Sequence, residues 1–209
     1  MDRAGWVRKN CKFASISGTE KGDKKTILLT GFQHEKKIGK NPSWQAVDDF
    51  QGRTFGDFSV TVRQLPNVFE KASEAMMETV KKEKPDIVVS LGYTPEDEIK
   101  VETVGRNMYR LDLTDEHDKH PPRLKIDPKG KDQWKATMPV AKVLKAIRDA
   151  GFKAHESDDA GGHTCNEVLY RLLAAKECPE IVGFVHVPKG RYKDETLKRI
   201  VEAIVEALV

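Results

Sequence analysis

The sequence predicts a single-domain α/β protein with an open, twisted, mainly parallel sheet and helices on both faces. Three apolar runs, at residues 26–30, 87–92 and 181–188, lack the alternation of half-exposed strands and are typical of strands buried on both faces. Segments with helical spacing of apolar residues lie between them, and this strand-helix order favours a layered sheet. With 209 residues the chain can bury a full core, and one domain is the simplest expectation.

The domain is expected to begin after a short extension. Residues 1–23 show no clear hydrophobic period and are interpreted as an extension, disordered or loosely docked, which leaves 24–209 as the α/β domain. The apolar run over 26–30 ends in Gly31-Phe32 and suits a central strand that opens into a loop. A polar stretch rich in turn residues follows, and residues 44–50 then resemble a short helix.

The middle of the chain continues this order of strands and helices. Residues 58–65 alternate like a strand near a sheet edge, and a long amphipathic helix is expected to start at Pro66 and to stop at Lys84-Pro85. The next apolar run should be reached by a right-handed crossover. Residues 99–104 alternate again, and residues 115–134, rich in Pro, Lys and Asp, are interpreted as a surface excursion.

The last part of the chain supplies three helices and two strands. A helix is expected over 139–150, and Gly151 ends it. Residues 152–156 form a short alternating run that leads into the helix around Cys165. After the last apolar run, apolar residues recur at helical spacing over 195–208.

Composition and charge exclude several classes of protein. The chain has 36 basic and 33 acidic residues, and no basic block has interleaved aromatics, so a nucleic-acid partner is not expected. No apolar run approaches a membrane span and the first residues open no signal peptide, so we expect a cytoplasmic protein without a membrane partner. Three widely spaced cysteines argue against a disulfide framework and a zinc site. We expect neither a metal nor a cofactor.

Cys165 has the surroundings of a reactive thiol. It follows a short polar segment and begins a helical pattern, so it should sit at a helix N-terminus, where unpaired amides and the helix dipole favour a thiolate. Asp159 or Thr164 could cap this helix, and Gly161-Gly162 permits positive φ or close approach to a ligand. The alternative is that Cys165 is a small buried hydrophobe.

Histidines and carboxylates offer partners for such a thiol, but each also has an ordinary structural interpretation. His186 is a lone polar residue near the end of an apolar run, and such a histidine is more often a satisfied core residue. Glu102 ends the alternating segment and would usually be one solvated carboxylate among many. His117 and His120 lie in the polar excursion and are expected to be solvated.

Five short motifs follow one another along the chain. They are Leu29-Thr30-Gly31-Phe32 with Asn41-Pro42-Ser43, Lys84-Pro85-Asp86-Ile87-Val88 with Gly92, Glu102 with Asn107, Ala160-Gly161 with Cys165-Asn166, and Gly183-Phe184 with His186-Val187-Pro188. In this order they resemble the pyroglutamyl peptidase I (pyrrolidone-carboxylate peptidase) family of cysteine peptidases, from about Lys25 to Val209. By that resemblance Cys165 is the nucleophile, His186 its general base and Glu102 the carboxylate that orients the imidazole, with Asp115 in reserve for this third role.

The same resemblance implies the reaction and the substrate. The family removes an N-terminal pyroglutamyl residue from peptides by thiolate attack on the pyroglutamyl carbonyl, a reaction that suits a cysteine and histidine supported by helix-start amides. Substrate contacts are expected from Phe32, Asn41, Tyr93 and Thr164. N-terminal pyroglutamyl peptides are therefore the expected partners.

The chain departs from the family at several positions. Glu35 stands where the family has an aromatic residue, Thr103 and Asp112 stand where it has arginines, and His163-Thr164 replaces an aromatic-aliphatic pair. Either the loop around Glu35 swings outward or Glu35 points inward and selects a substrate with a donor or positive charge. Segments after Asp115 and Pro188 are shorter than in bacterial members, so we expect a monomer or a weak oligomer rather than their tetramer.

The sequence is therefore compatible with three functions. The first is a pyroglutamyl-type cysteine peptidase. The second is a related cysteine amidohydrolase with a different small N-terminal amide specificity, motivated by the more polar positions Glu35, His163 and Thr164. The third is a catalytically weakened binding or regulatory homologue, motivated by the missing arginines.

Overall fold

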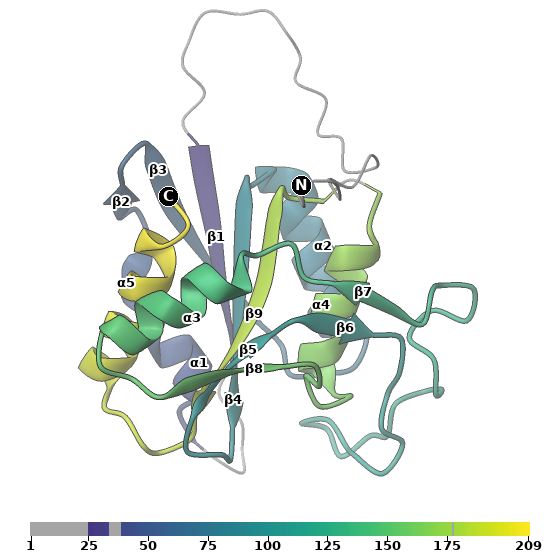
Figure 1. Cartoon of the computed structure of the whole chain (residues 1–209). Helices are drawn as coiled ribbons and strands as arrows, with labels where there is room; N and C mark the ends of the chain where they lie inside the picture. The colour runs from purple at the N-terminus through teal and green to yellow at the C-terminus, as the bar shows by residue number, and fades with distance from the viewer. Residues whose placement is uncertain (1–24, 34–38, 177) are drawn as a thin grey trace, which may run out of the picture.

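The computed structural model describes residues 25–33, 39–176 and 178–209, and its centre is a seven-stranded sheet (Figure 1). The strand order is β2-β3-β1-β4-β9-β5-β8. Every neighbouring pair is parallel except β2 with β3 and β5 with β9. The strands are β1 (Lys25–Phe32), β2 (Thr54–Phe55), β3 (Phe58–Leu65), β4 (Ile87–Thr94), β5 (Ile99–Glu102), β8 (Ala154–Ser157) and β9 (Ile181–Pro188). The predicted mainly parallel sheet is confirmed.

Helices cover both faces of this sheet, as predicted (Figure 1). One face carries α1 (Pro42–Gln45), a 3₁₀ turn (Asp48–Phe50), α3 (Val140–Asp149) and α5 (Asp194–Glu206). The other face carries α2 (Lys71–Glu83) and α4 (Thr164–Ala174). A separate two-stranded ribbon, β6 (Val104–Arg106) and β7 (Gln133–Lys135), lies against α4.

The two helix layers explain why the central strands are apolar without alternation. Successive side chains of a strand point to opposite faces, so a strand covered on both sides needs apolar residues at every position. In β1, Leu28 packs into the core under α2 and α4, while Ile27 and Leu29 pack into the core under α1, α3 and α5. All three are fully buried, and each such side chain stabilises the fold by about 1.5–3 kcal/mol.

Several element bounds differ from the sequence expectation. The helix expected from Pro66 begins only at Lys71, because Glu70 has φ of +64° and therefore cannot belong to a right-handed helix. The helix expected over 44–50 is divided into α1 and the 3₁₀ turn. Strand β4 continues through Thr94, beyond the predicted end at Gly92.

The excursion at 115–134 is less of a surface feature than its composition predicts. His117 and His120 are exposed as expected, but Asp115 is 4% exposed and Ile126 is fully buried. The Asp115 carboxylate accepts hydrogen bonds from the backbone amides of Phe69 (3.4 Å), His117 (2.8 Å) and Lys119 (3.1 Å). The excursion is thereby fixed to the segment that leads into α2.

Two sequence expectations fall on residues that the structure does not describe. These are the extension at 1–23 and the position of Glu35 in its loop. Among the helices of the described ranges, none has both the length and the apolar character needed to span a membrane.

Candidate active site

A cavity of about 680 Å³ lies where the carboxyl ends of β1 and β4 meet the start of α4. Such edges are the usual ligand-binding position in open α/β sheets. Phe32, Asn41, Tyr93, Cys165 and His186 all line it. The fold thus brings into one cavity five of the seven residues predicted to form the site, although they are widely separated in the sequence.

Cys165 is the second residue of α4, is partly exposed and is not part of a disulfide. The turn before it uses both glycines as predicted, because Gly161 and Gly162 have φ of +90° and +62°. The predicted caps are wrong: the N-cap residue is His163, and its side chain makes no capping hydrogen bond. The start of α4 therefore has no cap from the His163 side chain, and the amides of such a helix start suit an anion.

Two expected structural details in this region are also corrected. The Asp159 carboxylate accepts a hydrogen bond from the Gly161 amide (2.9 Å) and so organises the turn instead of the helix start.

Cys178 is buried and disulfide-bonded, a bond that the wide spacing of the cysteines did not predict.

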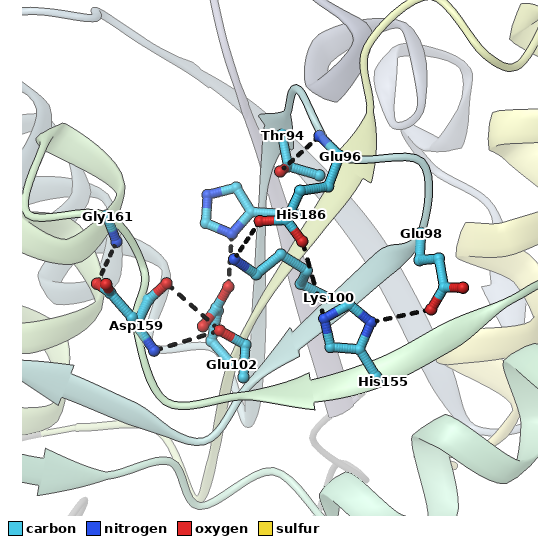
Figure 2. A network of polar contacts seen from close by, with 10 residues as sticks. Thr94, Glu96, Glu98, Lys100, Glu102, His155, Asp159, Gly161 and His186 are labelled. Atoms are coloured by element: carbon cyan, nitrogen blue, oxygen red, sulfur yellow. Dashed lines mark hydrogen bonds and ion pairs between the residues drawn. The ribbon is translucent and has the colours of Figure 1, made fainter.

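His186 and Glu102 form a buried pair on neighbouring strands (Figure 2). The imidazole Nδ1 lies 2.8 Å from Glu102 Oε1, and the two residues are 6% and 0% exposed. A carboxylate can only accept, so Nδ1 carries the hydrogen and Nε2 keeps its lone pair. Glu102, and not Asp115, contacts the imidazole, because the Asp115 carboxylate is occupied by backbone amides.

The imidazole is held in place by a glycine and an aromatic ring. Gly92 on β4 is the register partner of His186 on β9. A Cβ at Gly92 would lie 2.9 Å from Nε2 and Cδ2 of His186 and 2.9 Å from Phe184. The Phe184 ring lies 4.9 Å from the imidazole, centroid to centroid. Only glycine at position 92 leaves room for this ring, a role that the sequence interpretation did not assign.

Phe32 and Asn41 are fixed to each other through Ser43 at the start of α1. The Ser43 hydroxyl accepts a hydrogen bond from the Phe32 amide (2.9 Å), and Asn41 Oδ1 accepts from the Ser43 amide (3.1 Å) and hydroxyl (2.8 Å). Gly31 permits this approach, because a Cβ there would overlap the Ser43 carbonyl. The apolar and amide-bearing side chains expected to meet a substrate are therefore held rigidly.

Thr164, the remaining expected substrate contact, is not one of the residues that line the cavity. It is fully buried behind the cavity wall, and its hydroxyl donates to Asn67 Oδ1 at 2.5 Å. The neighbouring His163 does line the cavity; its Nε2 lies 3.0 Å from the Thr114 carbonyl, and burial lowers its pKa. These contacts fix the start of α4 to two loops.

Charged residues that were not predicted as site residues also line the cavity. Lys100 and Glu96 form an ion pair at 3.1 Å (Figure 2), and Arg110 pairs with Asp112 at 2.7 Å. The alternation of residues 99–104 could have placed Lys100 beside Glu102, because positions 100 and 102 face the same side of a strand. The sequence gives no indication that this side faces the cavity.

The fold and the cavity define an α/β protein with a cysteine and a buried histidine-glutamate pair at the carboxyl edge of its sheet. The comparisons with known proteins identify the family. The family model described as pyroglutamyl peptidase matches residues 25–197, and the chain belongs to this family.

Individual relatives agree with this membership. The chain is 36% identical over 168 residues to pyrrolidone-carboxylate peptidase 2 of Photorhabdus laumondii, which covers 78% of this chain and 77% of that protein. It is 33% identical over 166 residues to the pyrrolidone-carboxylate peptidase of Pyrococcus furiosus, covering 78% and 80%.

Solved structures support the fold assignment. A mutant pyrrolidone carboxyl peptidase from P. furiosus matches with a TM-score of 0.82 and 30% identity, over 88% of this chain and 98% of that chain. The pyroglutamyl peptidase I from Bacillus amyloliquefaciens matches with a TM-score of 0.80 and 26% identity, over 89% and 96%. The open α/β sheet is therefore the family's fold.

Proposed function

We propose that this protein is a cysteine peptidase that removes N-terminal pyroglutamyl residues from peptides. The observation that carries the proposal is the buried hydrogen bond between Glu102 and His186, since His186 lines the same cavity as the reduced thiol of Cys165. These residue types match the nucleophile, base and orienting carboxylate of cysteine and serine hydrolases, which supports the proposal. Family membership supports the choice of substrate.

The first chemical step is acyl transfer to Cys165. His186 Nε2 takes the proton of the Cys165 thiol, and the resulting thiolate attacks the carbonyl carbon that joins the pyroglutamyl ring to the next residue, forming a C–S bond. The helix-start amides of α4 stabilise the oxyanion. As the C–N bond breaks, the protonated His186 gives its Nε2 proton to the departing amine. The peptide shortened by one residue leaves, and a thioester remains on Cys165.

The second step is hydrolysis of the thioester. His186 Nε2 takes a proton from water, the resulting hydroxide attacks the thioester carbonyl, and the C–S bond breaks to release pyroglutamic acid and the thiolate. Glu102 is a positioning residue: by accepting the Nδ1 hydrogen bond it keeps Nε2 directed at the reacting atoms in both steps.

The flat, uncharged lactam needs apolar walls and a few amide-type partners. Phe32 and Tyr93 supply aromatic surface in the cavity, and Asn41 supplies an amide. The phenylalanine side chain is 2% exposed and packs against Phe184, so the pocket wall is rigid before the substrate arrives. Preorganisation of this kind reduces the cost of binding.

A related amidohydrolase acting on another small N-terminal amide is the second candidate. The observation that favours it is the polar cavity wall, to which His163 and Arg110 contribute. The two candidates differ in which acyl group is accepted, whereas the roles of Cys165 and His186 are the same. A panel of amides with different N-terminal acyl groups on one fluorogenic amine separates them.

The decisive experiment measures release of an aminocoumarin from its pyroglutamyl amide. We expect the wild-type protein to turn over this substrate, and Cys165→Ala and Cys165→Ser to lose turnover by more than about 10³-fold, because the thiol forms the covalent intermediate. Circular dichroism and thermal unfolding should show that both variants fold. Iodoacetamide should label the wild-type protein at Cys165 and abolish turnover. Wild-type turnover by Cys165→Ala would end the proposal.

A further inference from the structure

Lys100 lies beside the proposed catalytic histidine and faces the same cavity. It is the register partner of His186 across the antiparallel pair β5 and β9, so the two side chains project from the same face of the sheet. Glu102, two residues further along β5, projects from that face as well. The three side chains form one group in Figure 2, and Lys100 and His186 both line the cavity.

The side chain of Lys100 as a whole is largely withdrawn from solvent. Its side chain is 17% exposed, and it donates to Glu96 Oε1 at 3.1 Å. Glu96 is held in turn by the hydrogen bond from its amide to Thr94 Oγ1 (3.2 Å), and its carboxylate is 52% exposed. An ammonium has three hydrogen-bond donors, and among the described residues the Lys100 ammonium donates to Glu96. A partly buried cation of this kind gains from a second anionic partner.

The proposed reaction places the released residue next to Lys100. His186 gives its proton to the departing nitrogen, so that nitrogen lies within about 3 Å of Nε2 at this step. Cα atoms of paired antiparallel residues are about 5 Å apart, and a lysine side chain reaches about 6 Å from its Cα. The α-carboxylate of a free amino acid lies about 3–4 Å from its own nitrogen. A carboxylate on the released residue is therefore within reach of Lys100.

We propose that Lys100 recognises a carboxylate on the residue that follows the pyroglutamyl group, an inference that rests on the proposed function. The carboxylate has two sources with the same chemistry. One is the α-carboxylate of a pyroglutamyl dipeptide, and the other is the side chain of an acidic residue after the scissile bond. Lys100 is thus a specificity-determining residue, and a charge-assisted hydrogen bond supplies the preference.

The other cation in the cavity wall provides a matched control. Arg110 lies in the segment that follows β6 and not on β5. Its guanidinium is engaged by Asp112 through two contacts, at 3.3 and 2.7 Å, and its side chain is 54% exposed. It is neither on a strand paired with β9 nor a register partner of His186. Removal of this charge should therefore leave the carboxylate preference in place.

The test compares substrate pairs that differ only in charge. The α-carboxylate pair is pyroglutamyl-alanine and pyroglutamyl-alanine amide; the side-chain pair is pyroglutamyl-glutamate amide and pyroglutamyl-glutamine amide. In the wild-type protein we expect kcat/KM for the charged member of at least one pair to exceed that for its neutral member by about tenfold. The difference should lie mainly in KM, because the carboxylate is bound both before and during the reaction.

Variants assign the preference to the side chain. In Lys100→Met the ratio should fall to about one, in Lys100→Arg it should stay above about threefold, and in Arg110→Met it should equal the wild-type ratio. A wild-type ratio near one in both pairs, or a Lys100→Met ratio equal to that of the wild type, would overturn this inference alone. Failure of the wild-type protein to hydrolyse the neutral aminocoumarin amide would overturn the proposed function and this inference with it.

Discussion

Replacement of Gly92 by alanine tests whether the position of the His186 ring controls activity. The new Cβ would lie 2.9 Å from the Nε2 and Cδ2 atoms of the imidazole, whereas ordinary carbon contacts begin near 3.5 Å. The ring must therefore move by about 0.6 Å or more. Its Nδ1 hydrogen bond to Glu102 and the Phe184 ring restrict that movement, so some of the displacement is expected to reach Nε2.

Misplacement of a reacting group by about 1 Å can reduce the rate by about 10²-fold. For Gly92→Ala we expect kcat/KM on the pyroglutamyl aminocoumarin amide to fall about 10- to 100-fold, equivalent to about 1.4–2.7 kcal/mol of transition-state stabilisation. The backbone itself is not strained by the change, because Gly92 is not among the glycines with positive φ. Most of the loss should therefore appear in activity.

A second strand glycine separates this effect from general loss of stability. Gly183 lies on β9 three residues before His186, and a Cβ there would overlap the side chain of Met138 instead of the imidazole. Gly183→Ala should lower the free energy of unfolding by about 1–3 kcal/mol, as overpacking does, but leave turnover per folded molecule close to the wild-type value. If Gly92→Ala retained more than half of the wild-type kcat/KM, the reasoning about the ring position would be refuted.

Two further predictions concern buried carboxylates. Glu102→Gln should lower kcat about 10²-fold, which is less than the loss in Cys165→Ala. The amide keeps the imidazole in place but lacks the negative charge that supports the protonated imidazole. Activity within about threefold of the wild type would contradict the positioning role. Glu167 has its pKa raised, chiefly by burial, while Ser73 and the Glu70 amide donate to it. The folded state therefore holds the Glu167 proton at higher pH than the unfolded state. The free energy of unfolding should rise as the pH falls from neutrality toward the ordinary glutamate range. Denaturant titrations in which Glu167→Gln shows the same pH dependence as the wild type would contradict this.

Local patterns in the sequence were sufficient for the fold class and for one member of the site. Strand β9 has the predicted bounds of 181–188, because a run that is apolar at every position has few alternatives to a strand covered on both faces. Cys165 was placed at a helix start by residues within ten positions of it, and α4 begins at Thr164. Such signals are short in range, so the sequence determines them without knowledge of the tertiary arrangement.

The resemblance in motif order supplied what local patterns could not. Without the resemblance, His186 was more consistent with a satisfied core histidine than with a base, and Glu102 with a solvated carboxylate. The two lie 84 positions apart, and only the pairing of β5 with β9 brings their side chains to 2.8 Å. The choice of Glu102 over Asp115 as the partner of the imidazole therefore belongs to the tertiary structure.

The sequence thus determined the alternation of strands and helices, the candidate nucleophile and the family to which the motifs point. The tertiary structure decided that Thr164 lies behind the cavity wall, that Gly92 makes room for His186 and that Lys100 faces the same cavity. The physical reason is the separation along the chain between the residues that interact. Hydrophobic periodicity and helix-start chemistry act between residues a few positions apart, whereas strand order and register are set by packing between segments far apart in the chain, which no local pattern encodes.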